Sequence, residues 1–195
     1  MITSEISQWI NDYLHVSIDT EEYVEVRNFL ILWNLFEAKW FDCDFGKNKS
    51  NIDKIHLASD LVSTTIQYLQ HRYITNGSTN ERFMRLRLRN NHDTTSILRV
   101  LLGLTNNSCD IIKAIIMIIY RYRNNLFHGE KAIASLPIQK DNFIYANKFL
   151  IACLEAAKYG QTNEKYKENS RKSSTAGRKP ITYSRASNFG SKNEM

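Results

Sequence analysis

The chain has 195 residues, 43% of them hydrophobic and 11% aromatic, so it is long enough to bury a full hydrophobic core. Its 7 Gly and 2 Pro are too few for an all-β protein with many tight turns. The net charge of +6 is uneven, because residues 161–195 hold 8 Lys or Arg and 3 Glu, whereas residues 1–160 hold 18 basic and 17 acidic residues. This excludes a domain that is basic over its whole surface, so any RNA contact must come from a local patch or from the tail.

The N-terminal residues and the cysteines predict a cytoplasmic protein. The chain does not begin with a basic stretch followed by an apolar run, so we expect no secretion signal. The longest apolar stretch, residues 111–120, is interrupted by Lys113 and is too short to cross a bilayer. The cysteines are Cys43, Cys109 and Cys153, an odd number without the spacing of a zinc site. We therefore expect free thiols, no metal, no cofactor and no membrane segment.

Apolar residues at helical spacing predict helices along most of the chain. In chain order, we expect helices over residues 4–14, 20–40, 52–73, 80–89, 95–104, 109–128 and 141–159. The expected breaks are residues 42–51, 75–78 and 105–108, which are rich in Gly, Asn, Ser or Thr. No alternating strand pattern competes with this assignment. The predicted fold is an all-α bundle with antiparallel neighbours.

The composition changes at Gly160, where large apolar residues give way to Ser, Lys, Asn and Arg. Such a segment cannot bury enough apolar surface to offset the conformational entropy of the chain, so we expect disorder. The predicted domains are a helical domain, residues 1–159, and a disordered basic tail, residues 160–195. The tail either keeps the protein soluble or captures RNA phosphates loosely.

The most informative stretch is residues 121–129, Arg-Tyr-Arg-Asn-Asn-Leu-Phe-His-Gly, where the most apolar helix ends. Gly129 suits the left-handed turn that follows many helices. His128 would then lie at the negative end of the helix dipole, which favours its charged form. An arginine, an amide and an imidazole are thus expected together at one helix end.

These residue types are those needed to cleave a phosphodiester. Arg123 can bind a phosphate through a bidentate fork, and His128 can transfer a proton near neutral pH. Asn124 can orient His128 or the phosphate, so these three are the predicted catalytic residues. Arg121 is a predicted RNA-binding residue, with an ordinary helix-end cation as the alternative.

The spacing of Arg123 and His128 requires an explanation, because five residues place them about 140° apart on an ideal helix. Asn124 and His128 do share a face. Arg123 reaches the same pocket if its side chain curls over the helix end, or if the last turn is distorted. A second subunit packed about a two-fold axis is the third and most economical route.

The arginine, polar residue and histidine resemble the hallmark of the HEPN superfamily, the higher eukaryote and prokaryote nucleotide-binding domains. In that family an arginine, usually followed by a polar residue, is separated from a histidine by four to six intervening residues, and Arg123, Asn124 and His128 match this pattern. Residues 30–37, Leu-Ile-Leu-Trp-Asn-Leu-Phe-Glu, look like the family's aromatic first core helix. The resemblance covers residues 20–159 and implies an HEPN-like helical bundle.

The resemblance also implies an activity. Many HEPN proteins are metal-independent ribonucleases that act as dimers in toxin–antitoxin or anti-phage systems, and others have lost activity. HEPN toxins silenced by adenylylation carry a tyrosine two residues after the histidine, where this chain has Glu130.

A second arginine and histidine pair has the same spacing. Arg87 and His92 are separated by four residues, but they lie in a polar stretch with no apolar helix before it. Residues 123–128 are part of such a helix and precede a glycine, so Arg123 and His128 are the predicted site.

The sequence thus predicts a metal-independent endoribonuclease, a homodimer that acts as a toxin or anti-phage defence effector. His128 would act as acid or base on the ribose 2′-hydroxyl, leaving a 2′,3′-cyclic phosphate and a 5′-hydroxyl. RNA is the expected substrate, and an antitoxin or sensor protein is a further expected partner. The alternative is a non-catalytic HEPN scaffold or regulatory subunit. The nearly neutral net charge of residues 1–160 favours this alternative, and the intact motif of Arg123, Asn124 and His128 argues against it.

Overall fold

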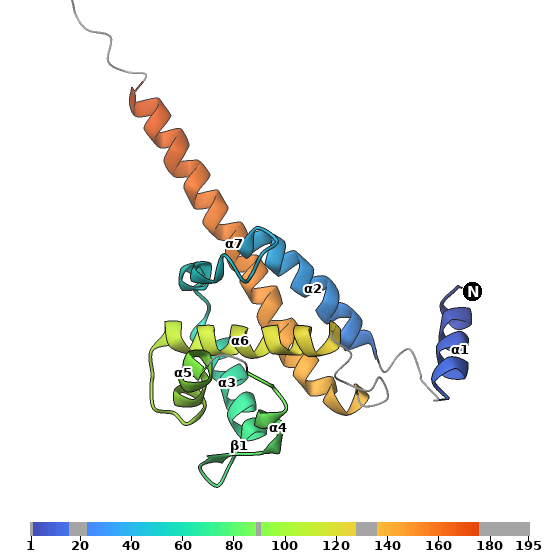
Figure 1. The fold of residues 1–195 in the computed structure, drawn as a ribbon. Helices are drawn as coiled ribbons and strands as arrows, with labels where there is room; N and C mark the ends of the chain where they lie inside the picture. The colour runs from blue at the N-terminus through green and yellow to red at the C-terminus, as the bar shows by residue number, and fades with distance from the viewer. Residues whose placement is uncertain (1, 16–22, 89–90, 128–135, 176–195) are drawn as a thin grey trace, which may run out of the picture. The chain divides into compact units, whose positions relative to one another are not determined.

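The chain is almost entirely helical in the computed structural model drawn in Figure 1, which describes residues 2–15, 23–88, 91–127 and 136–175. The all-α class is therefore confirmed. The chain divides into two units, residues 1–159 and 160–195. The elements are α1 (Ile2–Leu14), α2 (Val24–Phe41), η2 (Lys49–Lys54), α3 (Ser59–Tyr73), β1 (Ile74–Thr75), β2 (Ser78–Thr79), α4 (Glu81–Met84), α5 (Asn91–Leu101), α6 (Ser108–Phe127), η4 (Pro137–Gln139) and α7 (Lys140–Thr175), with η denoting 3-10 helices.

The centre of the first unit is α6, which is apolar on most of its circumference and is buried for that reason. It packs against α3, α5 and η2. Aromatic rings join it to the other two long helices, Tyr120 to Trp33 of α2 and Tyr122 to Phe143 of α7. The isoleucines at its centre are each at most 2% exposed: Ile112, Ile115, Ile116, Ile118 and Ile119. In the described part of the chain, no helix has the length and apolar character to cross a bilayer.

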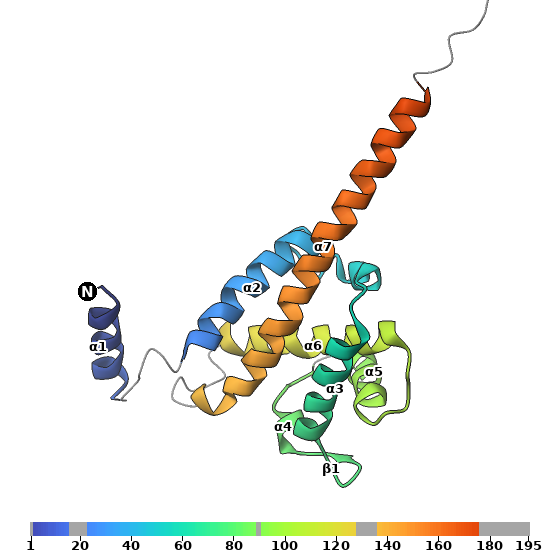
Figure 2. The same cartoon turned by 180° about the vertical axis from the view of Figure 1, so that it is seen from behind.

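Helices α2 and α7 lie side by side and run in the same direction (Figure 2). Near their N-terminal ends the rings of Phe29 and Phe143 pack 5.3 Å apart. Further along both helices, Trp40 Nε1 donates a hydrogen bond of 2.9 Å to the carbonyl of Cys153. This pair differs from the expected antiparallel arrangement. Only helices joined by a short loop must be antiparallel, and these two are joined by a long crossing of the chain.

The predicted helix over residues 52–73 is interrupted. Residues Lys49–Lys54 form η2, the chain is extended at Ile55, and α3 begins only at Ser59. Ile52 and Ile55 are nevertheless 2% and 1% exposed. Their spacing of three fits a 3-10 turn as well as an α-helix, so periodicity alone did not distinguish the two.

The expected break after α3 is a tight hairpin, and the basic helix that follows is short. Asn76 and Gly77 have φ of 51° and 73°, as the two central residues of a type I′ turn require. The side chain of Asn80 accepts hydrogen bonds from the backbone N–H groups of Arg82 and Phe83, which starts α4. The helix ends at Met84, not near residue 89 as expected.

The last helix is longer than the sequence predicts. The expected end is near Tyr159, but α7 continues to Thr175. Residues 161–175 contain no Pro and no Gly, so a helix already nucleated on the core extends through them without a new nucleus. Residues 160–175 of the expected tail are therefore helical, and residues 176–195 lie outside the described part of the chain.

Candidate functional site

The candidate site lies at the C-terminal end of α6. This helix spans Ser108–Phe127, close to the predicted range of 109–128, and it remains an α-helix as far as Phe127. His128 and Gly129, which are predicted to complete the site, lie outside the described residues. The structure therefore describes the arginine and amide half of the motif.

The side chains of Arg123 and Asn124 are joined. Arg123 Nη1 donates a hydrogen bond of 3.1 Å to Asn124 Oδ1. The Arg123 guanidinium also lies 4.8 Å from the centre of the Phe127 ring, a cation–π contact that limits its rotation. Asn124 is buried at 8% exposure, whereas Phe127 is 59% exposed. The structure thus holds Arg123 from two sides at the end of the helix.

One donor of Arg123 is left over. Its Nε is buried and has no hydrogen-bond partner among the residues that the structure describes. A buried N–H without an acceptor costs about 1–3 kcal/mol, so such a group calls for an explanation. Because Nη1 is bonded to Asn124, the Nε edge is the part of the guanidinium fork that an oxyanion would satisfy.

The described residues bear on two of the three routes by which Arg123 could reach the pocket of His128. The turn from Arg123 to Phe127 is regular, so no distortion of that turn turns the arginine. The Arg123 side chain instead reaches toward Asn124. Asn124 is four residues before His128, the spacing of one helix face. Within the described residues, the helix is therefore undistorted as far as Phe127, and the curled side chain and the second subunit stay predictions.

Arg121 is placed differently from Arg123. It is 7% exposed, and its Nε donates a 2.8 Å hydrogen bond to the carbonyl of Leu86. Its Nη2 lies 3.3 Å from Asn125 Oδ1, and Asn125 Nδ2 donates to the carbonyl of Arg85 at 3.3 Å. The sequence predicts an RNA contact for Arg121. The structure instead gives it the role of fixing the segment after α4 to the motif helix, because its donors are used inside the domain.

Sequence reasoning missed a buried tyrosine network beside the motif. The hydroxyls of Tyr73 and Tyr122 are 2.7 Å apart, and the Tyr68 hydroxyl donates to Asn142 Oδ1 at 2.8 Å. Burial raises the pKa of Tyr68 to about 12 and raises the pKa of Tyr122 well above its usual value of 10. These hydroxyls therefore stay protonated at neutral pH and connect α3, α6 and α7. The residues are far apart in the chain, so no local pattern indicates the network.

The second arginine and histidine pair lies on two different elements. Arg87 follows α4 with a left-handed backbone, φ 51°, and His92 is in the first turn of α5. The His92 side chain is 84% exposed. This pair is not preceded by a buried helix, in contrast to Arg123.

Among the described residues, no three His, Cys, Asp or Glu side chains gather closely enough to hold a metal ion. Comparison with known proteins adds no relative. No family model, curated protein or solved structure matches this chain. What this helix end does must therefore be inferred from its own residues.

Proposed function

We propose that this protein is a metal-independent endoribonuclease of the HEPN type, a homodimer acting as a toxin or anti-phage defence effector in the cytoplasm. The observation that carries the proposal is the cluster at the end of α6, where Arg123 is held by Asn124 and Phe127 and keeps one buried donor without a partner. His128 follows directly in the sequence. A guanidinium and an imidazole are the groups that RNA cleavage requires, and here they are five residues apart in the sequence.

In the proposed reaction, an imidazole of His128 removes the proton of a ribose 2′-hydroxyl, and the 2′-oxygen attacks the adjacent phosphorus. The bond from phosphorus to the 5′-oxygen breaks, and that oxygen takes a proton from a general acid. In a dimer with both motifs in one cleft, the partner's His128 is that acid. The products are a 2′,3′-cyclic phosphate and a free 5′-hydroxyl. An unperturbed imidazole has a pKa of about 6.5, which suits both roles near neutral pH.

Arg123 would bind the scissile phosphate and stabilise the negative charge that develops on its oxygens. Asn124 acts through Arg123, since its Oδ1 accepts from Nη1 and fixes the orientation of the fork. Asn124 is therefore a positioning residue in this proposal. DNA lacks the 2′-hydroxyl, so it would bind without being cut.

A specific observation favours a second candidate, a non-catalytic HEPN scaffold or regulatory subunit of a toxin–antitoxin or defence complex. The guanidinium of Arg123 is already bonded and stacked within its own helix, and its Nε is shielded from solvent. A phosphate would reach that donor only after the side chains that cover it move. In a non-catalytic scaffold, Arg123 would serve only to stabilise the C-terminal end of α6.

The decisive experiment compares RNA cleavage by the full chain with cleavage by His128→Ala, Arg123→Ala and the matched control His92→Ala. We expect the first two variants to lose about 10²-fold or more in rate, while the control cleaves like the parent protein. Expression of His128→Ala or Arg123→Ala should not arrest growth, whereas expression of the control should. If His128→Ala cleaves at the parental rate, His128 is not the catalytic residue and the proposed site is wrong. If purified parent protein cleaves no RNA, the scaffold is the correct function.

A further inference from the structure

The segment after the hairpin carries three exposed arginines, Arg82, Arg85 and Arg87. Helix α4 is only one turn long, and the chain leaves the helix after Met84. Had the helix continued to residue 89, Arg87 would lie about 140° around the helix from Arg82. Arg82 and Arg85 line an open hollow of about 590 Å³, together with His71, Thr75, Asn80 and Glu81.

The charge of this region contrasts with the rest of the domain. Residues 71–91 contain five arginines and one acidic residue, Glu81, whereas residues 1–160 as a whole carry a net charge of only +1. Glu81 pairs with Arg85 at 3.3 Å, but both side chains are largely exposed, at 89% and 78%. Such an exposed pair is weak, so a phosphate can displace the carboxylate.

Arg87 adds an indication that its side chain matters. Its φ of 51° lies in the left-handed region, where glycine is the usual residue after a helix. An arginine at this position strains the backbone, and a glycine would not. Arg87 is nevertheless kept there as an exposed basic residue, two positions after Arg85 in the sequence.

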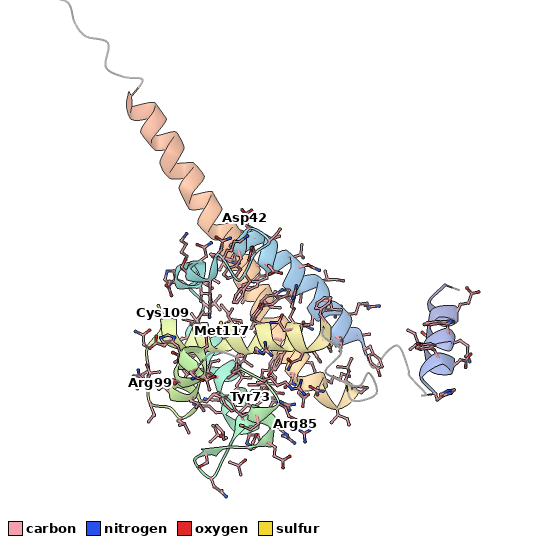
Figure 3. The ribbon with its side chains drawn as sticks, in the orientation of Figure 1. Asp42, Tyr73, Arg85, Arg99, Cys109 and Met117 are labelled. Carbon is pink, nitrogen blue, oxygen red and sulfur yellow. The ribbon has the colours of Figure 1, made fainter. Side chains whose placement is uncertain are left out.

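This surface is attached to the candidate site. The side chains of Arg121 and Asn125, in the last two turns of α6, bond to the backbone carbonyls of Leu86 and Arg85. Figure 3 labels Arg85 below α6, on the same side as Tyr73. The two asparagine and arginine contacts thus fix the basic segment beside the helix that ends in the motif.

We propose that Arg82, Arg85 and Arg87 form a docking surface for the phosphate backbone of single-stranded RNA, which leads the substrate to the end of α6; this inference rests on the proposed ribonuclease function. Three exposed cations within six residues offer separate contacts to the phosphates of one strand. Met84, 71% exposed among the arginines, offers an apolar contact for an unstacked base. The nearly neutral charge of the remaining domain explains why binding would concentrate here.

The test measures RNA binding separately from cleavage. The full chain is titrated onto a fluorescent 2′-O-methyl oligoribonucleotide, which cannot be cut by 2′-hydroxyl attack, at several salt concentrations. The patch variant carries Arg82→Ala, Arg85→Ala and Arg87→Ala. Its control carries Lys39→Ala, Lys47→Ala and Lys54→Ala, three exposed lysines whose loss changes the net charge equally.

We expect the patch variant to bind at least about tenfold more weakly. The slope of log affinity against log salt should fall by about 2, which is about 0.7 for each lost phosphate contact on a single strand. The lysine control should keep the parental slope. Arg87→Gly, which also removes the backbone strain, should weaken binding without lowering the melting temperature, so lost affinity is not mistaken for lost folding.

Equal binding by the patch variant and the lysine control would overturn the inference and assign the arginines to another partner, such as an acidic protein. The two proposals fail in different ways. In one case the parent protein binds the 2′-O-methyl probe through the patch but cuts no natural RNA. The docking surface then stands and the ribonuclease proposal is refuted. In the opposite case the parent protein cuts RNA, and the patch variant binds and cuts RNA like the lysine control. The ribonuclease proposal then stands and the docking surface is refuted.

Discussion

Arg121 and Arg123 lie two residues apart on one helix, yet the structure predicts opposite consequences for their loss. We consider Arg121→Met, which keeps much of the aliphatic side chain, and Arg123→Ala. The first should destabilise the domain and the second should not. The reason is that the two guanidinium groups have different partners.

For Arg121, the main loss is the 2.8 Å hydrogen bond from its Nε to the carbonyl of Leu86. A hydrogen bond to a charged group contributes about 1.5–3 kcal/mol, and the carbonyl left behind in a buried position adds to the cost. The 3.3 Å contact with Asn125 is longer and adds less. We therefore expect the free energy of unfolding to fall by about 3 kcal/mol. For a chain of this size that is a decrease of about 6–12 °C in melting temperature.

For Arg123→Ala, the stabilising contacts that are lost and the buried unpaired donor that is removed have nearly equal and opposite effects on stability. Alanine removes one partly buried hydrogen bond to Asn124 and the cation–π contact with exposed Phe127, together about 1–2 kcal/mol. It also removes the buried Nε donor, whose missing partner costs about 1–3 kcal/mol. The net change in stability should lie within about 1 kcal/mol of zero.

Urea unfolding followed by tryptophan fluorescence measures both variants, because Trp33 is buried in the core. We expect a clearly lower midpoint for Arg121→Met and a nearly unchanged midpoint for Arg123→Ala, with equal slopes. The assignment of a structural role to Arg121 and a functional one to Arg123 would be refuted if Arg123→Ala lost as much stability as Arg121→Met.

Three further predictions concern the tyrosine network and the proposed chemistry. Tyr122→Phe should lower the free energy of unfolding by about 1–2 kcal/mol in urea unfolding, because it leaves the buried Tyr73 hydroxyl without its 2.7 Å partner; a stability equal to that of the parent would contradict the network. Stability should fall as pH rises from about 10 toward 12, because the pKa of Tyr68 is raised to about 12 in the folded protein and is about 10 when unfolded, so the unfolded chain loses its proton first. Tyr68→Phe should flatten that decline, measured as urea midpoints across the alkaline range, and an unchanged decline would exclude Tyr68 as its source. Finally, RNA cleavage should persist in EDTA and its rate should change with pH near the His128 titration, whereas an absolute requirement for magnesium in the same gel assay would refute acid–base catalysis by His128.

The sequence by itself determined the long helices and the location of the candidate site. The predicted range 109–128 matches α6, Ser108–Phe127, because its dense apolar residues satisfy both helical periodicity and the need of the core for a buried central helix. The position of the C-terminal end of α6, where Arg123 and Asn124 lie, was predicted from the same apolar pattern, which stops there. These features depend on residues within four positions of one another, which sequence spacing expresses directly.

Tertiary structure decided what single residues do. Arg121 looks like any helix-end cation, and only folding brings it to the carbonyl of Leu86, 35 residues earlier. Likewise, Tyr122 meets Tyr73 from 49 residues away. The packing of Phe83 and Leu86 in the core accompanies the end of α4 at Met84, beside the exposed Arg82 and Arg85. Such contacts form only after long stretches of chain have been closed into loops, and no local pattern records which distant partner a closed loop will bring near.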